Sequence, residues 1–186
     1  MLTPSSSLLE VAVAVSEALE NAGVIAPLSG GGAMSIYTEN RYQTRDLDFV
    51  TSERGKVLRT ILEPLGFESS PDGRHFTHSV SGWLVEFPPG PVAFGETTVR
   101  SADLPIIETR YGRLRVITPT QSLMDRLAAY FHWNKQRTLR DQARQLVASL
   151  DAQGRIDWEE LYCWATREGI SRSDLDEACA RLPSAR

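Results

Sequence analysis

The stretch that most constrains the fold runs from Leu28 to Val50 and reads LSGGGAMSIYTENRYQTRDLDFV. The segment before the glycines, VIAPLS at 24–29, predicts a short buried strand, and AMSIYTE at 33–39 predicts a short helix. A glycine-rich turn between a strand and a helix N-terminus can hold phosphate oxygens with its backbone N–H groups. Gly30, Gly31 and Gly32 occupy that position, although a tight turn that binds no ligand would have the same pattern.

The glycine pattern excludes two common nucleotide-binding motifs. No lysine follows as in G-x-x-x-x-G-K-[ST], and the spacing differs from G-x-G-x-x-G. The chain is therefore expected to contain neither a P-loop nor a dinucleotide-binding fold.

A pair of aspartates lies inside the alternating run TRDLDFV, residues 44–50. On a strand, Asp46 and Asp48 project from one face, roughly 7 Å apart along the backbone, while Leu47 and Phe49 project from the other. Two such charges repel each other unless a cation lies between them. Carboxylate-lined sites suit Mg²⁺, so the pair indicates a metal site for phosphoryl chemistry. The alternative is an exposed edge strand with ordinary surface acids.

A third acid lies in GWLVEF, residues 82–87, which predicts a strand that ends at Pro88. Glu86 shares a strand face with Leu84 and has apolar neighbours on both sides. A charge in such a run needs a partner or a function, because its burial is costly. Glu86 is therefore a candidate third metal ligand, with a solvent-facing glutamate on an edge strand as the alternative.

The remaining pattern predicts a mixed α/β part followed by a helical part. Hairpins are expected over 67–80 and over 106–117, and helices over 8–22 and 55–66. Thr118, Pro119 and Gln121 form a predicted capping box with proline at the first helical position. Helices are then expected at 122–133, from a cap at Thr138, at 157–169 and at 173–182. We predict a boundary between residues 1–117 and 118–186.

Taken in order, these motifs resemble the nucleotidyltransferase superfamily with a DNA polymerase β-like palm, over roughly residues 24–150. The similarity is closest to the AbiEii-type and minimal nucleotidyltransferases, in which GG-x-A precedes T-x-D-[ILV]-D. The matching positions here are Gly30, Gly31, Ala33, Thr44, Asp46, Leu47 and Asp48. A helical D-K-L-x-A motif and an Arg-Asp pair resemble Asp125, Arg126, Leu127, Ala129, Arg140 and Asp141. Where the family's motif has lysine, this chain has Arg126. Its guanidinium is a planar fork of donors, whereas a lysine ammonium is a point charge.

The resemblance implies an α/β palm with a mixed sheet flanked by helices, and transfer of a nucleoside monophosphate from a nucleoside triphosphate to an acceptor hydroxyl. It implies two Mg²⁺ ions, replaceable by Mn²⁺, on Asp46, Asp48 and Glu86. It also implies nucleotide contacts from Gly30, Gly31, Thr44 and Arg126, with Lys135 as a weaker candidate. Members of the group often act as toxins or phage-defence effectors on tRNA ends or proteins, which implies an RNA or protein acceptor and a cognate antitoxin.

The charge of the chain bears on the kind of acceptor that it can bind. The chain of 186 residues has a net charge of −4, which argues against nonspecific nucleic-acid binding by the whole surface. Residues 101–150, however, hold eight basic and four acidic side chains, which is compatible with an RNA acceptor.

The N-terminus reads as an amphipathic helix and not as a signal peptide, so a cytoplasmic protein without a membrane span is expected. Two functions other than nucleotidyl transfer stay open, namely a non-catalytic palm-fold binding module and a metal-dependent phosphohydrolase.

Overall fold

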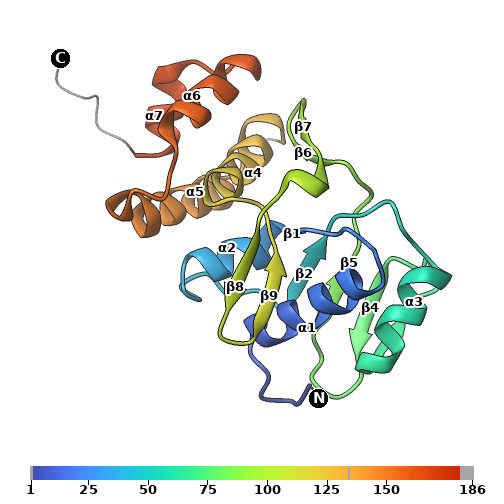
Figure 1. The fold of residues 1–186 in the computed structure, drawn as a ribbon. Coiled ribbons are helices and arrows are strands. Elements are labelled where there is room, and N and C mark those ends of the chain that lie inside the picture. Colours follow the sequence, from blue (N-terminus) through green and yellow to red (C-terminus); the bar gives the residue numbers. More distant parts are fainter. Residues whose placement is uncertain (1, 134, 181–186) are drawn as a thin grey trace.

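A five-stranded mixed sheet organises the first part of the chain (Figure 1). The computed structural model describes residues 2–133 and 135–180. The strand order in the sheet is β1-β2-β5-β4-β3. β2 and β5 run parallel, and the other neighbouring pairs are antiparallel. The strands are β1 (Leu28–Ser29), β2 (Asp46–Phe49), β3 (Phe67–Ser69), β4 (His75–His78) and β5 (Leu84–Glu86).

The two faces of the sheet differ in polarity, as the alternation in β2 predicts. Leu47 and Phe49 are fully buried and join one apolar core with Phe76 and Val85. Helices α1 (Leu8–Asn21) and α3 (Lys56–Leu62) add buried apolar residues to this core. The opposite face carries Asp48 and is left open for other contacts.

Helix α2 (Gly30–Tyr37) begins at the glycines, earlier than the expected start at Ala33. The glycine run is therefore the first turn of the helix and not a loop before it. A Cβ atom at Gly32 would lie 2.9 Å from Leu47 Cδ2 and 3.0 Å from Leu28 Cδ1. The missing side chain thus lets the helix begin in close contact with both β1 and β2.

Antiparallel hairpins accompany the helices, and the two expected hairpins are present. β3 pairs with β4, and β8 (Ile106–Thr109) pairs with β9 (Gly112–Arg115). Two further hairpins were not predicted, β4 with β5 and β6 (Val92–Phe94) with β7 (Thr97–Val99). Short 3₁₀ turns lie at η1 (Glu63–Leu65), η2 (Ser101–Asp103) and η3 (Asp151–Gln153).

The described residues after Thr118 are helical. The helices are α4 (Pro119–His132), α5 (Arg137–Leu150), α6 (Trp158–Arg167) and α7 (Arg172–Ala178). The capping box at the start of α4 is confirmed, because the Thr118 side chain accepts the Gln121 N–H and the Gln121 side chain accepts the Thr118 N–H. The expected cap of α5 at Thr138 is wrong: Gln136 occupies that position without a side-chain hydrogen bond. Residues 181 and 182 of the last expected helix lie outside the described residues.

These elements confirm the expected α/β class with a mixed sheet flanked by helices. Within the described residues, no helix combines the length and the apolar character needed to cross a membrane. The boundary between 1–117 and 118–186 stays a prediction, since α4 contacts α2 and β6 as well as α5.

Candidate active site

One row of side chains crosses four strands on the open face of the sheet. Asp48 of β2 pairs in register with Ser29 of β1 on one side and with Glu86 of β5 on the other. Glu86 in turn pairs with His75 of β4. Residues paired in register project from the same face, with Cβ atoms roughly 5 Å apart. The register therefore places two of the three predicted acids side by side.

The Asp48 carboxylate lies directly against the first residue of α2. A Cβ atom at Gly30 would be 2.1 Å from Asp48 Oδ2, and Gly30 has a φ of +59°. Both the backbone conformation and the close approach require glycine. Burial, followed by the negative charges of Glu86 and Asp125, raises the pKa of Asp48 to about 6, with Arg126 acting in the opposite direction. The Asp48 carboxylate is thus surrounded by more negative than positive charge.

Asp46 lies at the exposed start of β2, on the same face as Asp48. Its backbone N–H donates to Oγ1 of Thr44 at 3.1 Å. A Cβ atom at Gly31 would lie 3.5 Å from Thr44 Cγ2 and 3.3 Å from Tyr42 Cε1. Thr44 and Gly31, both predicted to contact the nucleotide, are therefore neighbours, and Thr44 also fixes the turn that leads into Asp46.

Arg126 of α4 belongs to the quoted helical motif, acts electrostatically on Asp48 and lines the same cleft. Its guanidinium donates to the Asp125 carboxylate and, through Nη1, to Gln142 Oε1 at 3.3 Å. Desolvation opposes the charged form, but the Asp125 carboxylate and the more distant Asp48 raise the pKa of Arg126. Arg126 thus stays cationic beside Asp48 and is already held by a partner on its own helix.

A cleft of about 380 Å³ lies between these elements. One side is the start of α2 and the end of β2, and the other is α4 together with the segment before β6. The lining residues are Ser29, Gly30, Asp48, Val50, Pro88, Pro89, Pro91, Val92, Ala93, Asp125, Arg126 and Trp133. A second hollow of about 400 Å³ shares four of them and continues along α4 to Glu96 and His132. Asp46 and Glu86 are not among the described residues that line either hollow.

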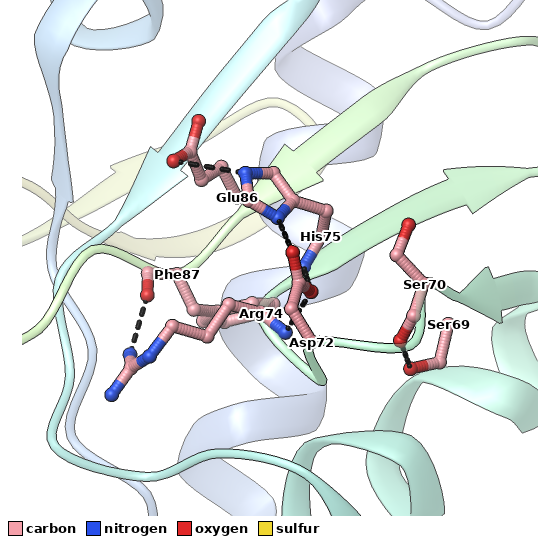
Figure 2. Close-up of polar contacts among 7 residues, drawn as sticks. All are labelled: Ser69, Ser70, Asp72, Arg74, His75, Glu86 and Phe87. Carbon is pink, nitrogen blue, oxygen red and sulfur yellow. Dashed lines mark hydrogen bonds and ion pairs between the residues drawn. The ribbon is translucent and has the colours of Figure 1, made fainter.

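One oxygen of the Glu86 carboxylate contacts His75 of β4 (Figure 2). Glu86 Oε1 lies 3.1 Å from His75 Nε2, and His75 Nδ1 lies 2.5 Å from Asp72 Oδ2. The hydrogen bond to Asp72 and the charge of Glu86 raise the pKa of His75. Along β4, His75 is exposed and His78 is buried. The sequence gave no indication that His75 adjoins Glu86.

The donor set suits a hard divalent cation that shares its coordination with phosphate. Among the described residues, no group of three His, Cys, Asp or Glu side chains is placed to hold an ion. Mg²⁺, however, commonly uses one or two protein carboxylates, with waters and substrate phosphates completing its shell. The uncompensated negative charge at Asp48 favours such an ion. Asp46 and Asp48 therefore fit a cation that arrives with a nucleotide, and Glu86 could join them through Oε2 while Oε1 contacts His75.

Most of the basic side chains of residues 101–150 are engaged within the chain. Arg115 forms an ion pair with Glu20 at 2.6 Å and is largely buried. The others in contact are Arg113 with Glu108, Arg126 with Asp125, Arg137 with Asp141, and Arg144 with the carbonyl oxygens of Glu177 and Ala178. The charge of this segment therefore supports an RNA acceptor less than its composition suggested. Lys135 is exposed after α4 and is not among the residues that line the cleft.

Solved structures with a similar fold include an antibiotic-resistance factor and a nucleotidyltransferase-like protein. The antibiotic-resistance factor ANT(2'')-Ia in solution is 17% identical with a TM-score of 0.52, over 87% of this chain and 92% of that one. A nucleotidyltransferase-like antigenic protein from Paracoccidioides brasiliensis is 15% identical with a TM-score of 0.58, over 97% and 96%. ANT(2'')-Ia in complex with adenylyl-2''-tobramycin is 17% identical with a TM-score of 0.50, over 86% and 97%.

The chain therefore has a nucleotidyltransferase-like fold, and the predicted resemblance to that superfamily is confirmed at the level of the fold. No protein-family model matches the sequence, and the comparison with curated proteins gave no match. The AbiEii subtype stays a prediction.

Proposed function

We propose that the protein is a Mg²⁺-dependent nucleotidyltransferase that moves a nucleoside monophosphate from a nucleoside triphosphate to an acceptor hydroxyl. The observation that carries most weight is the Asp48 carboxylate held against Gly30 at the start of α2, within a cleft that Arg126 also lines. This arrangement combines an acidic cation site, a helix N-terminus for phosphate and a fixed guanidinium, which together suit a triphosphate. The fold of the solved neighbours supports the same reaction class.

The residues have separate roles in this mechanism. Backbone N–H groups at Gly30 and Gly31 bind triphosphate oxygens, and Arg126 offsets their charge from α4. Asp46, Asp48 and Glu86 would hold the Mg²⁺ ions, which would supply charge neutralisation and acidify the acceptor hydroxyl. The acceptor oxygen bonds to the α-phosphorus as the bond to the pyrophosphate oxygen breaks. The hydroxyl proton passes to Glu86 or to solvent, and pyrophosphate leaves.

Two acceptor classes are open to this enzyme. The family resemblance favours an RNA end, such as that of tRNA, or a protein side chain. A small hydroxylated molecule is the second candidate, because one solved neighbour is in complex with adenylyl-2''-tobramycin. The second hollow also favours a small or cationic acceptor, since its charged lining includes Glu96 and Asp125, and Arg126 there is already paired.

Incubation with each labelled nucleoside triphosphate and Mg²⁺ or Mn²⁺ tests the proposal, with total RNA, total protein or a panel of aminoglycosides as acceptors. Label on one acceptor class that is lost in Asp46→Asn and Asp48→Asn supports transfer. Nucleotide hydrolysis without a labelled acceptor indicates a phosphohydrolase. Absence of Mg²⁺-dependent nucleotide binding indicates a non-catalytic binding module.

A toxin or phage-defence role with a cognate antitoxin is the biological part of the proposal. Growth arrest after expression of the native chain, absent for Asp48→Asn, supports it. Normal growth at equal protein levels contradicts it without affecting the proposed chemistry.

A further inference from the structure

A chain of contacts connects the β3–β4 turn to the row of side chains that contains Asp48 (Figure 2). Asp72 Oδ1 accepts the backbone N–H groups of Arg74 at 2.9 Å and of His75 at 3.2 Å. The turn therefore fixes this carboxylate and leaves Oδ2 for His75 Nδ1, 2.5 Å away. With Nδ1 committed to Asp72, the ring presents Nε2 to Glu86.

The backbone around this chain of contacts keeps it in register. Arg74 Nη1 donates to the carbonyl oxygen of Phe87 at 2.6 Å, and the Phe87 N–H donates to the carbonyl oxygen of Arg74 at 2.9 Å. Pairing between β4 and β5 is thereby extended past Glu86, so these strands resist a shift relative to each other. A glutamate has three rotatable side-chain bonds, and a partner fixed in register removes most of that freedom.

The contact between His75 and Glu86 affects the position of the Glu86 carboxylate more than the stability of the fold. The side chains of His75 and Glu86 are 51% and 45% exposed, and exposed ion pairs contribute little to folding. Glu86 nevertheless adjoins Asp48 in the sheet, one strand away from the cleft. A residue that holds the Glu86 carboxylate on this face keeps it within reach of a cation bound at Asp48.

We infer that His75 is a positioning residue for Glu86 and that Asp72 orients the His75 ring. This inference rests on the proposed function, in which Glu86 completes the cation site or accepts the acceptor proton. His75 keeps the carboxylate in the row with Asp48 before the cation and nucleotide bind, so that less conformational freedom is lost when the site assembles.

Single-turnover and steady-state transfer assays on His75→Ala, His75→Gln and Asp72→Asn test the inference, with Thr77→Ala as the control on the same exposed face of β4. We expect His75→Ala to lower kcat about 10–100-fold, the usual effect of losing a residue that orients a metal ligand. The KM for the nucleotide should stay within about 2-fold, because Glu86 does not line the nucleotide cleft. His75→Gln, which retains an N–H donor, should recover most of the rate, and Thr77→Ala should match the native chain.

Unchanged or increased kcat in His75→Ala overturns the inference, as does full activity in Glu86→Gln. Failure of the proposed function is a different outcome, namely a native chain that transfers no nucleotide to any acceptor. In that case nitrogen NMR of the histidine rings decides the positioning claim. The His75 Nε2 resonance must shift in Glu86→Gln and the Nδ1 resonance in Asp72→Asn, and a ring spectrum that is unchanged in both variants overturns it.

Discussion

At the scale of single residues, the charge of Asp48 lowers the stability of the fold, although the proposed function requires it. Its carboxylate is half-buried between Gly30 and other acids, which raises its pKa to about 6 from 3.8. In the folded protein Asp48 keeps its proton up to about pH 6, whereas the unfolded chain releases it near 3.8. Its contribution to stability is therefore most favourable below pH 3.8 and falls as the pH rises to 6. Above that pH the fold carries an unfavourable charge that a bound cation would relieve.

Asp48→Asn should consequently stabilise the fold while it abolishes transfer. A shift of this size, which already includes the attraction to Arg126, corresponds to at most about 3 kcal/mol at pH 7.5, and solvent screening of this half-buried group reduces it to roughly 1–2 kcal/mol. Urea unfolding at pH 4 and pH 7.5 measures the difference. The gain should nearly vanish at pH 4, and Asp46→Asn, at an exposed position, should change stability by less than about 0.5 kcal/mol. Equal effects of Asp48→Asn at both pH values would contradict the account.

Gly30 can be tested against a glycine with the same backbone conformation in open space. Gly30 has a φ of +59° and a close approach to Asp48, whereas Gly154 has a φ of +63° and nothing within 4 Å of an added Cβ. Gly154→Ala should cost about 1 kcal/mol for the left-handed conformation. Gly30→Ala should cost roughly 1–2 kcal/mol more and reduce transfer, as measured by urea unfolding and labelled-nucleotide assays. Equal costs would show that the contact with Asp48 has no energetic effect.

At the scale of elements, the sequence predicted the helices and strands that local residue patterns determine. It missed the hairpin that depends on contacts with a residue far along the chain. Alternation in TRDLDFV gave the correct faces of β2, and the Thr118 capping box gave the start of α4. The β6–β7 hairpin follows a Pro-rich segment that reads as a strand end, and an acid far along the chain holds it in place. Glu168 accepts the Glu96 and Thr97 N–H groups at 3.0 and 3.1 Å and the Thr97 hydroxyl at 2.7 Å.

The same limit applies to the candidate site. Asp46 and Asp48 could be predicted because one strand carries both, and their shared face follows from its period of two. The adjacency of Glu86 to Asp48 and of His75 to Glu86 depends on strand order and register, which no local pattern encodes. Asp125 was part of the quoted motif but had no predicted role, and its charge acts on both Asp48 and Arg126.

Glu168 should therefore control the β6–β7 hairpin and, through Ala93, one wall of the cleft. Burial acts to raise the pKa of Glu168, but hydrogen bonds from the Glu96 backbone, Thr97 and His132 lower it overall. Ionised Glu168 therefore stabilises the fold at neutral pH, and this contribution is lost as the pH falls through the folded-state pKa of Glu168. Glu168→Ala should lower stability by about 2 kcal/mol at pH 7.5. Urea unfolding measures this, and hydrogen exchange should show faster exchange at the Thr97 amide.

Glu159→Ala is the control for this prediction. Glu159 is exposed on α6, the helix whose C-cap is Glu168, so its loss should change stability by only a few tenths of a kcal/mol. A Glu168→Ala variant as stable as Glu159→Ala would show that the hairpin does not depend on this anchor.

At the scale of the whole molecule, the cleft joins the sheet with α2 on one side and α4 on the other. A ligand that contacts both sides stabilises the folded chain as one unit. Nucleoside triphosphate with Mg²⁺ at about 100 times its Kd should raise Tm by roughly 5–10 °C. Removal of Mg²⁺ with EDTA should abolish most of this shift, and Asp48→Asn should not respond. A shift that persists in EDTA and in Asp48→Asn would place nucleotide binding elsewhere.

The central claim is that the site formed by Asp46 and Asp48 transfers a nucleoside monophosphate. The most direct measurement compares nucleoside triphosphate labelled at the α-phosphate with the same nucleotide labelled at the γ-phosphate, in the presence of Mg²⁺ and the acceptor identified by the screen. The account predicts that the α-label becomes attached to the acceptor, that the γ-label is released in pyrophosphate, and that Asp48→Asn does neither. Release of the γ-label as inorganic phosphate, with no α-label on any acceptor, would contradict it.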